Sequence, residues 1–451
     1  MQHRSFKISV FALSVFVLFS CKPKLDAPAV DAGKLDVSKY VAFGNSITSG
    51  YADGALYYDA QMVSYPNLLA QQFELIGGGE FKQPLMPMSS VGYGGAGNSR
   101  YALGLVTDCN NVTSLSPKTG PGDFNALGGI ATEGPFNNMG MPGAKAITSI
   151  YPGYGNPANG LGKYNPFFTR ILEVSEYGNA SMLAKAAAQK PTFFSLFIGN
   201  NDVLSYALAG GAADSVTPSG GAPGTGFDAT IDLIISTLSA NGAKGVIANI
   251  PDITNLPYFT LVPYNGLLLD SAKAAALNAI PVYATVGLKF TPGNNPFLVH
   301  DKSLPAFFNI RKMKQGELVL LSTPQDSIKC FGLGSVAAFH NRHVLDEAEI
   351  AKIQGAIHSY NNKLKAVADE KGFAFVDVNA FMAKCKKGIL YNGVTINTTF
   401  VSGGAFSLDG IHLTPIGNAL LANEFIKAIN STYGSNIPQV EVTKYKGVTF
   451  P

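Results

Sequence analysis

The stretch YVAFGNS, residues 40–46, is a short apolar run that ends in a glycine, an asparagine and a serine. A continuous apolar run of this length predicts a buried strand of a parallel sheet, and the glycine after it favours a tight turn. Similar runs occupy residues 192–198, 245–250 and 373–378. We expect each of them to be a further strand of the same sheet.

Helical patterns separate these runs. Apolar residues recur at spacings of three and four over residues 350–367, and a shorter pattern covers residues 231–240. A last helix is expected from Pro415, because Thr414 can cap it and proline is favoured at the first helical position. Strands that alternate with helices predict an α/β fold, with a parallel sheet that helices cover on both faces.

The charge of the chain excludes one class of partner. Charged residues make up only 14 % of the 451 residues, and the formal net charge is +3. No run of lysine and arginine stands out, so the basic surface expected of a nucleic-acid-binding protein is missing. Nucleic acid is therefore not an expected partner.

The cysteines and histidines show no metal-binding pattern. Cys109, Cys330 and Cys385 lie at wide spacings, which excludes a disulfide framework and a paired zinc site. The sequence allows one disulfide but does not say which pair forms it. His340 and His343 are three residues apart but have no cluster of further ligands beside them, so no metal is predicted.

The first 21 residues read as a processing signal rather than as part of the fold. A basic start is followed by an apolar run over residues 8–19 and by Leu-Phe-Ser-Cys at residues 18–21. This stretch resembles a bacterial lipoprotein signal, and the resemblance implies cleavage before Cys21 and acylation of that cysteine. The run is shorter than the roughly 20 residues that span a bilayer. Residues 22–37 are expected to be a tether, and the protein is expected to be exported and anchored in the bacterial outer membrane.

Ser46 follows directly on the first predicted strand. A sharp strand-to-helix turn would present its side chain at the carboxyl end of the sheet, where open α/β folds bind ligands. A serine hydroxyl needs a base that a third group positions. Of the six histidines, only His412 has an acidic residue three positions earlier, Asp409. This carboxylate could fold back onto one ring nitrogen while the other faces the serine, although each motif alone would read as an ordinary turn.

Two further blocks could stabilise negative charge on a carbonyl oxygen. Ile-Gly-Asn-Asn-Asp, residues 198–202, follows another predicted strand, and a side-chain amide there could donate to the oxyanion. Asn-Met-Gly-Met-Pro-Gly, residues 138–143, contains glycines that let a backbone N–H approach a substrate. Each block alone is also typical of a turn.

Taken in order, these four blocks resemble the SGNH (GDSL-like) serine hydrolases. The resemblance implies a five-stranded parallel sheet with flavodoxin-like winding in a three-layer sandwich. It implies that Ser46 is the nucleophile and that Asp409 and His412 complete the triad. It further implies an oxyanion hole made by the backbone N–H groups of Ser46 and Gly140 and by the side chain of Asn201. No cofactor or metal is needed.

The chain departs from the family pattern at Asn45, where the usual motif has aspartate. An amide can keep a local turn hydrogen bond, so the triad is expected to be intact. The hydrolase domain is expected over residues 38–432. Two long insertions, at about 74–134 and 251–343, are expected to be walls or a lid around the site. The tail, residues 433–451, is expected to pack on the domain as an edge strand.

The expected activity is hydrolysis of carboxylic esters through an acyl-serine intermediate. Lipid or short-chain acyl esters are the default substrates, and O-acetylated carbohydrate is the close alternative. A lipid-anchored surface protein that binds glycan or lipid without turnover is the alternative from another class. The sequence does not indicate an oligomeric state.

Overall fold

A five-stranded parallel sheet forms the centre of the computed structural model, which describes residues 29–160, 162–212, 215–301, 303–305 and 308–451. The strand order is β13-β6-β5-β1-β4. Numbered along the chain, the order is 2-1-3-4-5, that of flavodoxin-like folds. The predicted fold class is therefore confirmed. The strands are β1 (Tyr40–Gly44), β4 (Asn138–Gly140), β5 (Phe193–Phe197), β6 (Lys244–Ala248) and β13 (Ala374–Val376).

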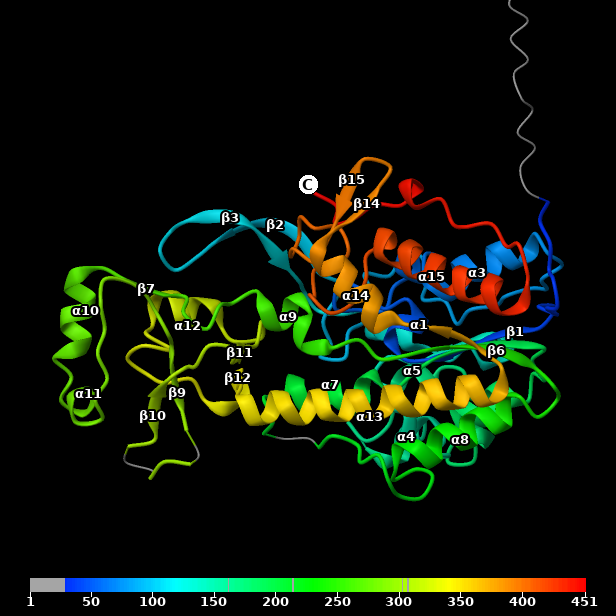
Figure 1. Ribbon diagram of the computed structural model, residues 1–451, viewed down its shortest axis with the longest axis horizontal. Coiled ribbons are helices and arrows are strands. Elements are labelled where there is room, and N and C mark those ends of the chain that lie inside the picture. The colour runs from blue at the N-terminus through cyan, green and yellow to red at the C-terminus, as the bar shows by residue number, and fades with distance from the viewer. Residues whose placement is uncertain (1–28, 161, 213–214, 302, 306–307) are drawn as a thin grey trace, which may run out of the picture.

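Helices cover both faces of this sheet, which gives three layers (Figure 1). One layer contains α3 (Tyr65–Glu74), α14 (Val378–Lys387) and α15 (Pro415–Tyr433). The opposite layer contains α4 (Ala146–Ser149), α5 (Pro166–Thr169), α7 (Asn200–Leu208), α8 (Phe227–Leu238) and α13 (Glu347–Lys371). The shorter α1 (Ser46–Ser49), α2 (Tyr58–Met62) and α6 (Met182–Ala187) complete the domain.

Capping residues account for where helices α13 and α15 begin and for where α13 ends. Asp346 caps α13 by accepting from the Glu349 N–H, and Gly372 ends it in the left-handed conformation. Thr414 caps α15, with proline at the first position as predicted. The apolar stripe of α13 is buried, as its spacing predicted: Ile353, Ile357, Tyr360, Leu364 and Val367.

Strand β4 and the tail differ from the sequence predictions. β4 has only three residues, and its identity as a strand comes from pairing with β1, where Ala42 lies opposite Asn138. The tail packs on the domain, with Ile437 and Val440 buried. Its described residues form the short helix η7 (Val442–Lys444) and no strand, so the prediction of an edge strand is wrong. The Asn423 side chain on α15 donates to the Val440 carbonyl and accepts from the Val440 N–H. Val440 therefore has no free backbone group that could pair with a sheet.

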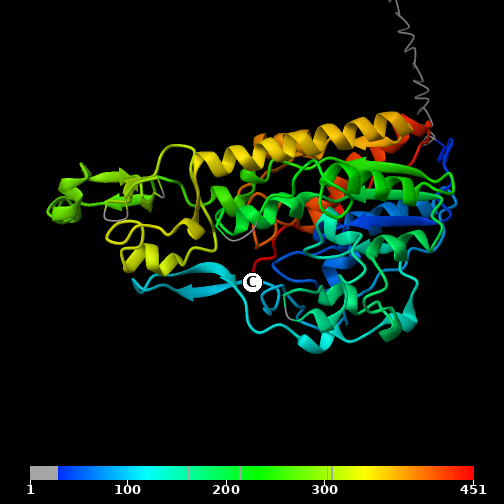
Figure 2. The same cartoon turned by 90° about the horizontal axis from the view of Figure 1, so that it is seen from below.

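The first insertion contributes an antiparallel hairpin made of β2 (Ala102–Thr107) and β3 (Thr113–Lys118). The hairpin extends away from the sheet and reaches α12 (Gln325–Cys330) of the second insertion (Figure 2). A disulfide joins Cys109, at the hairpin turn, to Cys330. An ion pair between Lys329 and Asp108 at 3.2 Å lies beside it. Two chain segments 221 residues apart are thereby tied together.

The second insertion has a hydrophobic core of its own. Buried side chains from Leu267 to Val344 pack together, and the large aromatic members are Tyr283, Phe290, Phe297 and Phe339. In the described part of this segment, two-stranded ladders and short helices accompany this core. The ladders are β7 (Leu267–Leu269) with β8 (Gly293–Asn295), β9 (Leu298–His300) with β10 (Ile310–Lys312) and β11 (Leu318–Val319) with β12 (Val344–Leu345). The helices are α9 (Pro257–Thr260), α10 (Ser271–Asn278), α11 (Pro281–Thr285) and α12.

The remaining hairpin, β14 (Ile389–Tyr391) with β15 (Val394–Ile396), follows α14 along the chain and precedes the turn that carries His412. Within the described part of the chain, no helix has both the length and the apolar character needed to cross a membrane.

Candidate active site

Ser46, His412 and Asp409 form a continuous hydrogen-bonded chain at the carboxyl end of the sheet. The distance from Ser46 Oγ to His412 Nε2 is 2.8 Å, and that from His412 Nδ1 to Asp409 Oδ2 is also 2.8 Å. Ser46 begins α1 directly after β1, and the Tyr51 ring packs on the imidazole with 4.8 Å between ring centroids. The arrangement places a base on the serine hydroxyl and a carboxylate behind the base.

Asp409 is held in its ionised form. Burial of the carboxyl opposes ionisation, but the positive charge that His412 can carry and the hydrogen bonds from the His412 and Ile411 backbone outweigh it, and the pKa of Asp409 is lowered. Oδ1 accepts from the N–H groups of Ile411 and His412 at 2.8 and 2.9 Å. Oδ2 also accepts from the Gly54 N–H at 2.8 Å. The carboxylate is therefore oriented from three sides.

The turn at Asp53 and Gly54 supports the triad from a distant part of the sequence, and the sequence analysis missed it. The Asp53 carboxylate accepts from the Leu408 N–H at 2.9 Å, and the Asp53 N–H donates to Ser407 Oγ at 3.0 Å. Asp53 adopts a φ of 51°, and a Cβ on Gly54 would lie 2.5 Å from the Tyr101 ring. The Asp-Gly dipeptide, typical of a tight turn, was the available signal.

The free N–H groups near Ser46 are only partly those that the resemblance implies. Among the described residues, the backbone N–H groups of Ser46 and Gly143 have no hydrogen-bond acceptor. Asn201 Nδ2 donates to the Ala144 carbonyl at 3.0 Å, which leaves its second N–H to point elsewhere. Ser46, Gly143 and Asn201 line one cleft, so these three residues can surround a carbonyl oxygen on Ser46.

The structure contradicts the assignment of Gly140 to the oxyanion hole. The Gly140 N–H already donates to Asn138 Oδ1 at 2.9 Å. A Cβ at Gly140 would lie 2.4 Å from the Ser49 nitrogen, so this glycine is required for the close approach of β4 to α1. Gly143, three residues later, takes the role in our assignment, and its φ of +80° explains why it is glycine.

Asp202 fixes the loop that carries Gly143. Its Oδ2 accepts from the Ala146 N–H at 2.7 Å at the start of α4. Burial raises the pKa of Asp202 to about 6, although the hydrogen bonds from Ala146 and Thr217 oppose the shift. Asp202 therefore ties the start of α7, which carries Asn201, to the neighbouring loop.

Asn45 keeps the turn hydrogen bond that the sequence analysis predicted. Its Oδ1 accepts from the Ile47 N–H at 3.2 Å and caps α1. The turn from which Ser46 begins α1 is therefore capped with asparagine in place of the usual aspartate.

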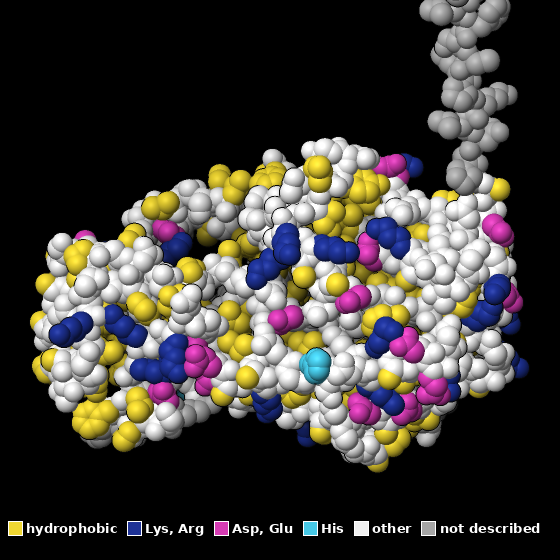
Figure 3. All heavy atoms as spheres, viewed as in Figure 1, with side chains coloured by type: hydrophobic (Ala, Val, Ile, Leu, Met, Phe, Trp, Pro, Cys, Tyr) yellow, Lys and Arg dark blue, Asp and Glu magenta, His cyan; other side chains and the backbone are white. Residues whose placement is uncertain are grey.

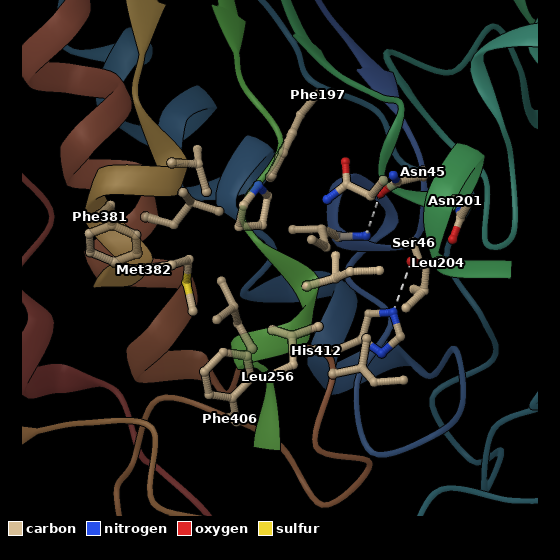
Figure 4. A pocket seen from close by; sticks show the side chains of 18 residues that line it. Asn45, Ser46, Phe197, Asn201, Leu204, Leu256, Phe381, Met382, Phe406 and His412 are labelled. Atoms are coloured by element: carbon tan, nitrogen blue, oxygen red, sulfur yellow. Dashed lines mark hydrogen bonds between the residues drawn. The ribbon is translucent and has the colours of Figure 1, made fainter. Parts of the chain in front are cut away.

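Two cavities meet at Ser46. The larger is an open cleft with a volume of about 1070 Å³, to which the β2–β3 hairpin, α12 and the loop after α9 all contribute. Figure 3 shows a hollow in the surface beneath the position of the hairpin in Figure 1. The smaller is a narrow apolar pocket with a cavity volume of about 40 Å³. Ser46 and His412 lie at one end of this pocket, and Phe381, Met382 and Phe406 lie at the other (Figure 4).

Metal ligands do not cluster in the described part of the chain, where no three His, Cys, Asp or Glu residues group together. His340 and His343 lie around the short helix η6 (Asn341–His343), where the His340 side chain accepts from the Arg342 N–H at 3.5 Å.

Comparisons with known proteins identify the family. One similar solved structure is that of an extracellular lipase from Streptomyces rimosus, with 13 % sequence identity and a TM-score of 0.32 over 90 % of this chain and 100 % of that one. No curated protein matches the chain. The model of the family described as GDSL-like Lipase/Acylhydrolase matches residues 40–425. The chain therefore belongs to the GDSL-like lipase/acylhydrolase family.

Proposed function

We propose that the protein hydrolyses carboxylic esters through an acyl-serine intermediate on Ser46. Membership of the lipase/acylhydrolase family supports an ester hydrolase. The observation that carries the serine mechanism is the chain of two 2.8 Å hydrogen bonds from Asp409 through His412 to Ser46. A binding protein would have no need of a base on a serine hydroxyl.

The geometry supports a two-stage reaction. His412 Nε2 takes the proton of Ser46 Oγ as the oxygen attacks the ester carbonyl, and the new oxyanion accepts from Ser46, Gly143 and Asn201. His412 returns the proton to the leaving alcohol, and the acyl group stays on Ser46. Water, activated by the same imidazole, then releases the acid. The Asp409 carboxylate keeps Nδ1 protonated and stabilises the imidazolium.

The two cavities suggest where the acyl part and the alcohol part of an ester would bind. The apolar pocket beside Ser46 suits an acyl chain, because most of its lining side chains are apolar. Because the apolar lining continues from Ser46 to Phe381 and Phe406 at the other end of the pocket, we favour lipid or other acyl esters over O-acetylated carbohydrate. The open cleft, with carboxylates and Lys329 on its walls, can accept an alcohol of considerable size.

A fluorophosphonate probe tests the proposal, because it reacts only with an activated serine. We expect the wild-type protein to be labelled and the Ser46→Ala variant to remain unlabelled. Ser114→Ala, a serine that also lines the cleft, is the matched control and should be labelled normally. Folded wild-type protein that does not react would favour a non-catalytic binding protein instead.

We also propose that the protein is exported and anchored through a lipid on Cys21, which lies outside the described residues. Besides the signal-like residues, the Cys109–Cys330 disulfide supports an oxidising compartment. Cys21→Ala should move the protein from the membrane fraction to the soluble fraction and leave esterase activity unchanged. Cell fractionation measures this, and full membrane retention by the variant would contradict acylation at Cys21.

A further inference from the structure

Two residues that line the apolar pocket beside Ser46 carry buried amide atoms without a hydrogen-bond partner among the described residues. Asn45 is 1 % exposed and Asn200 is 5 % exposed, and both line the pocket. Within the described residues, Asn45 Nδ2 and Asn200 Oδ1 have no hydrogen-bond partner. Figure 4 shows Asn45 beside Ser46, on the side of the pocket opposite Phe381 and Phe406.

The fold places these two residues next to Ser46 and Asn201. Asn45 immediately precedes Ser46, and Asn200 immediately precedes Asn201. They follow β1 and β5, which are neighbours in the sheet, with Gly44 opposite Phe197. Both residues therefore belong to the part of the pocket lining that adjoins Ser46.

The two unsatisfied atoms are complementary to each other in type. Asn45 Nδ2 is a donor and Asn200 Oδ1 is an acceptor. A methylene chain would satisfy neither, and leaving buried polar groups unpaired is unfavourable. A keto oxygen could accept from Asn45 but could not donate to Asn200. A hydroxyl group can accept one hydrogen bond and donate another, so it offers both kinds of missing partner.

We propose that the pocket selects acyl chains that carry a hydroxyl group close to the ester carbonyl. This inference rests on the proposed function, because it deepens the choice of acyl group at the same site. The reaction itself is unchanged. The ester C–O bond breaks, the acyl group passes through Ser46 to water, and the chain hydroxyl is neither formed nor consumed.

A matched series of esters tests the selection. Esters with one leaving group and octanoyl, 2-hydroxyoctanoyl, 3-hydroxyoctanoyl or 4-hydroxyoctanoyl chains are compared by kcat/KM. We expect one hydroxylated chain to exceed octanoyl by about tenfold or more, because a site with buried polar groups rejects the analogue that leaves them unpaired. Equal or lower kcat/KM for all three hydroxylated chains would overturn the proposal.

Two substitutions connect the preference to the amides. Asn45→Asp keeps the oxygen that accepts from the Ile47 N–H but replaces the Nδ2 donor by a second oxygen. The hydroxyl on the acyl chain has one proton, which cannot be donated both to this oxygen and to Asn200 Oδ1. Asn200→Leu is close in size and removes the acceptor. Both should lower the ratio of hydroxyoctanoyl to octanoyl turnover toward one. Asn179→Asp, on an exposed residue that lines neither cavity, should keep the wild-type ratio. If the ratio of hydroxyoctanoyl to octanoyl turnover stayed unchanged in both pocket variants, groups other than these two amides would cause the preference for the hydroxyl.

A binding measurement separates this inference from the hydrolase proposal. The Ser46→Ala variant should bind the preferred free hydroxyoctanoic acid about tenfold more tightly than octanoic acid in a calorimetric titration. A binding preference without any turnover by the wild type would remove the hydrolase proposal and leave the pocket selective. Turnover without a hydroxyl preference in either measurement would remove the pocket selectivity alone. The titration needs no amide variant to fold.

Discussion

Replacing Asp409 by asparagine should lower kcat by about 10⁴-fold, the effect of a triad carboxylate that fixes the imidazole tautomer. The amide can place an N–H against His412 Nδ1, so the proton would move to Nε2 and the ring could no longer accept from Ser46 Oγ. Steady-state kinetics with one activated ester measure the effect. A near-normal variant would mean that another group, such as the Gly54 turn, orients His412.

The double variant gives the control for this assignment. Residues that act as one unit lose activity non-additively, so Ser46→Ala with Asp409→Asn should be scarcely slower than Ser46→Ala alone. Multiplied losses would place Asp409 outside the triad. Folding is checked by thermal unfolding across pH. Because the folded-state pKa of Asp409 lies below its ordinary value of 3.8, its ionisation stabilises the native state above that pH, and this contribution disappears on further acidification. The variant should lack this part of the acid sensitivity.

Asn201→Ala should lower kcat by about 10²- to 10³-fold, with a smaller change in KM, because its amide donates to charge that develops only in the transition state. The expected loss corresponds to about 2.7–4 kcal/mol of transition-state stabilisation. Ser205→Ala, which removes a hydroxyl from the same helix, is the matched control and should stay within a few-fold of wild type. A similarly small effect of Asn201→Ala would show that its only role is to hold the Ala144 carbonyl.

The sequence predicted those parts of the fold that local patterns determine. The strands at residues 193–197 and 244–248 are largely apolar, and the long helix α13 carries a regular apolar stripe with a cap at each end. Strand β4 lacks such a pattern, because Asn138 and Gly140 are typical of turns. Only the pairing with β1 makes it a strand.

In the candidate site, too, local sequence patterns predicted some residues, whereas contacts between distant parts of the chain determine others. Ser46, Asp409 and His412 were recognisable because their spacing in the sequence reflects their chemistry. The choice between Gly140 and Gly143 depends on which backbone N–H already has an acceptor, and neighbouring residues in space decide that. The support of Asp409 by Gly54 joins positions 355 residues apart, which no local pattern reveals.

The disulfide between Cys109 and Cys330 closes a ring of chain that contains β4, β5 and β6. Ser46 precedes this ring and His412 follows it. A single proteolytic cut anywhere within the ring would therefore divide the polypeptide into a fragment with the nucleophile and a fragment with the base, still covalently joined. Nicked protein would migrate as one species until a reductant separated the two fragments. As long as the disulfide is intact, dilution would not separate Ser46 from His412.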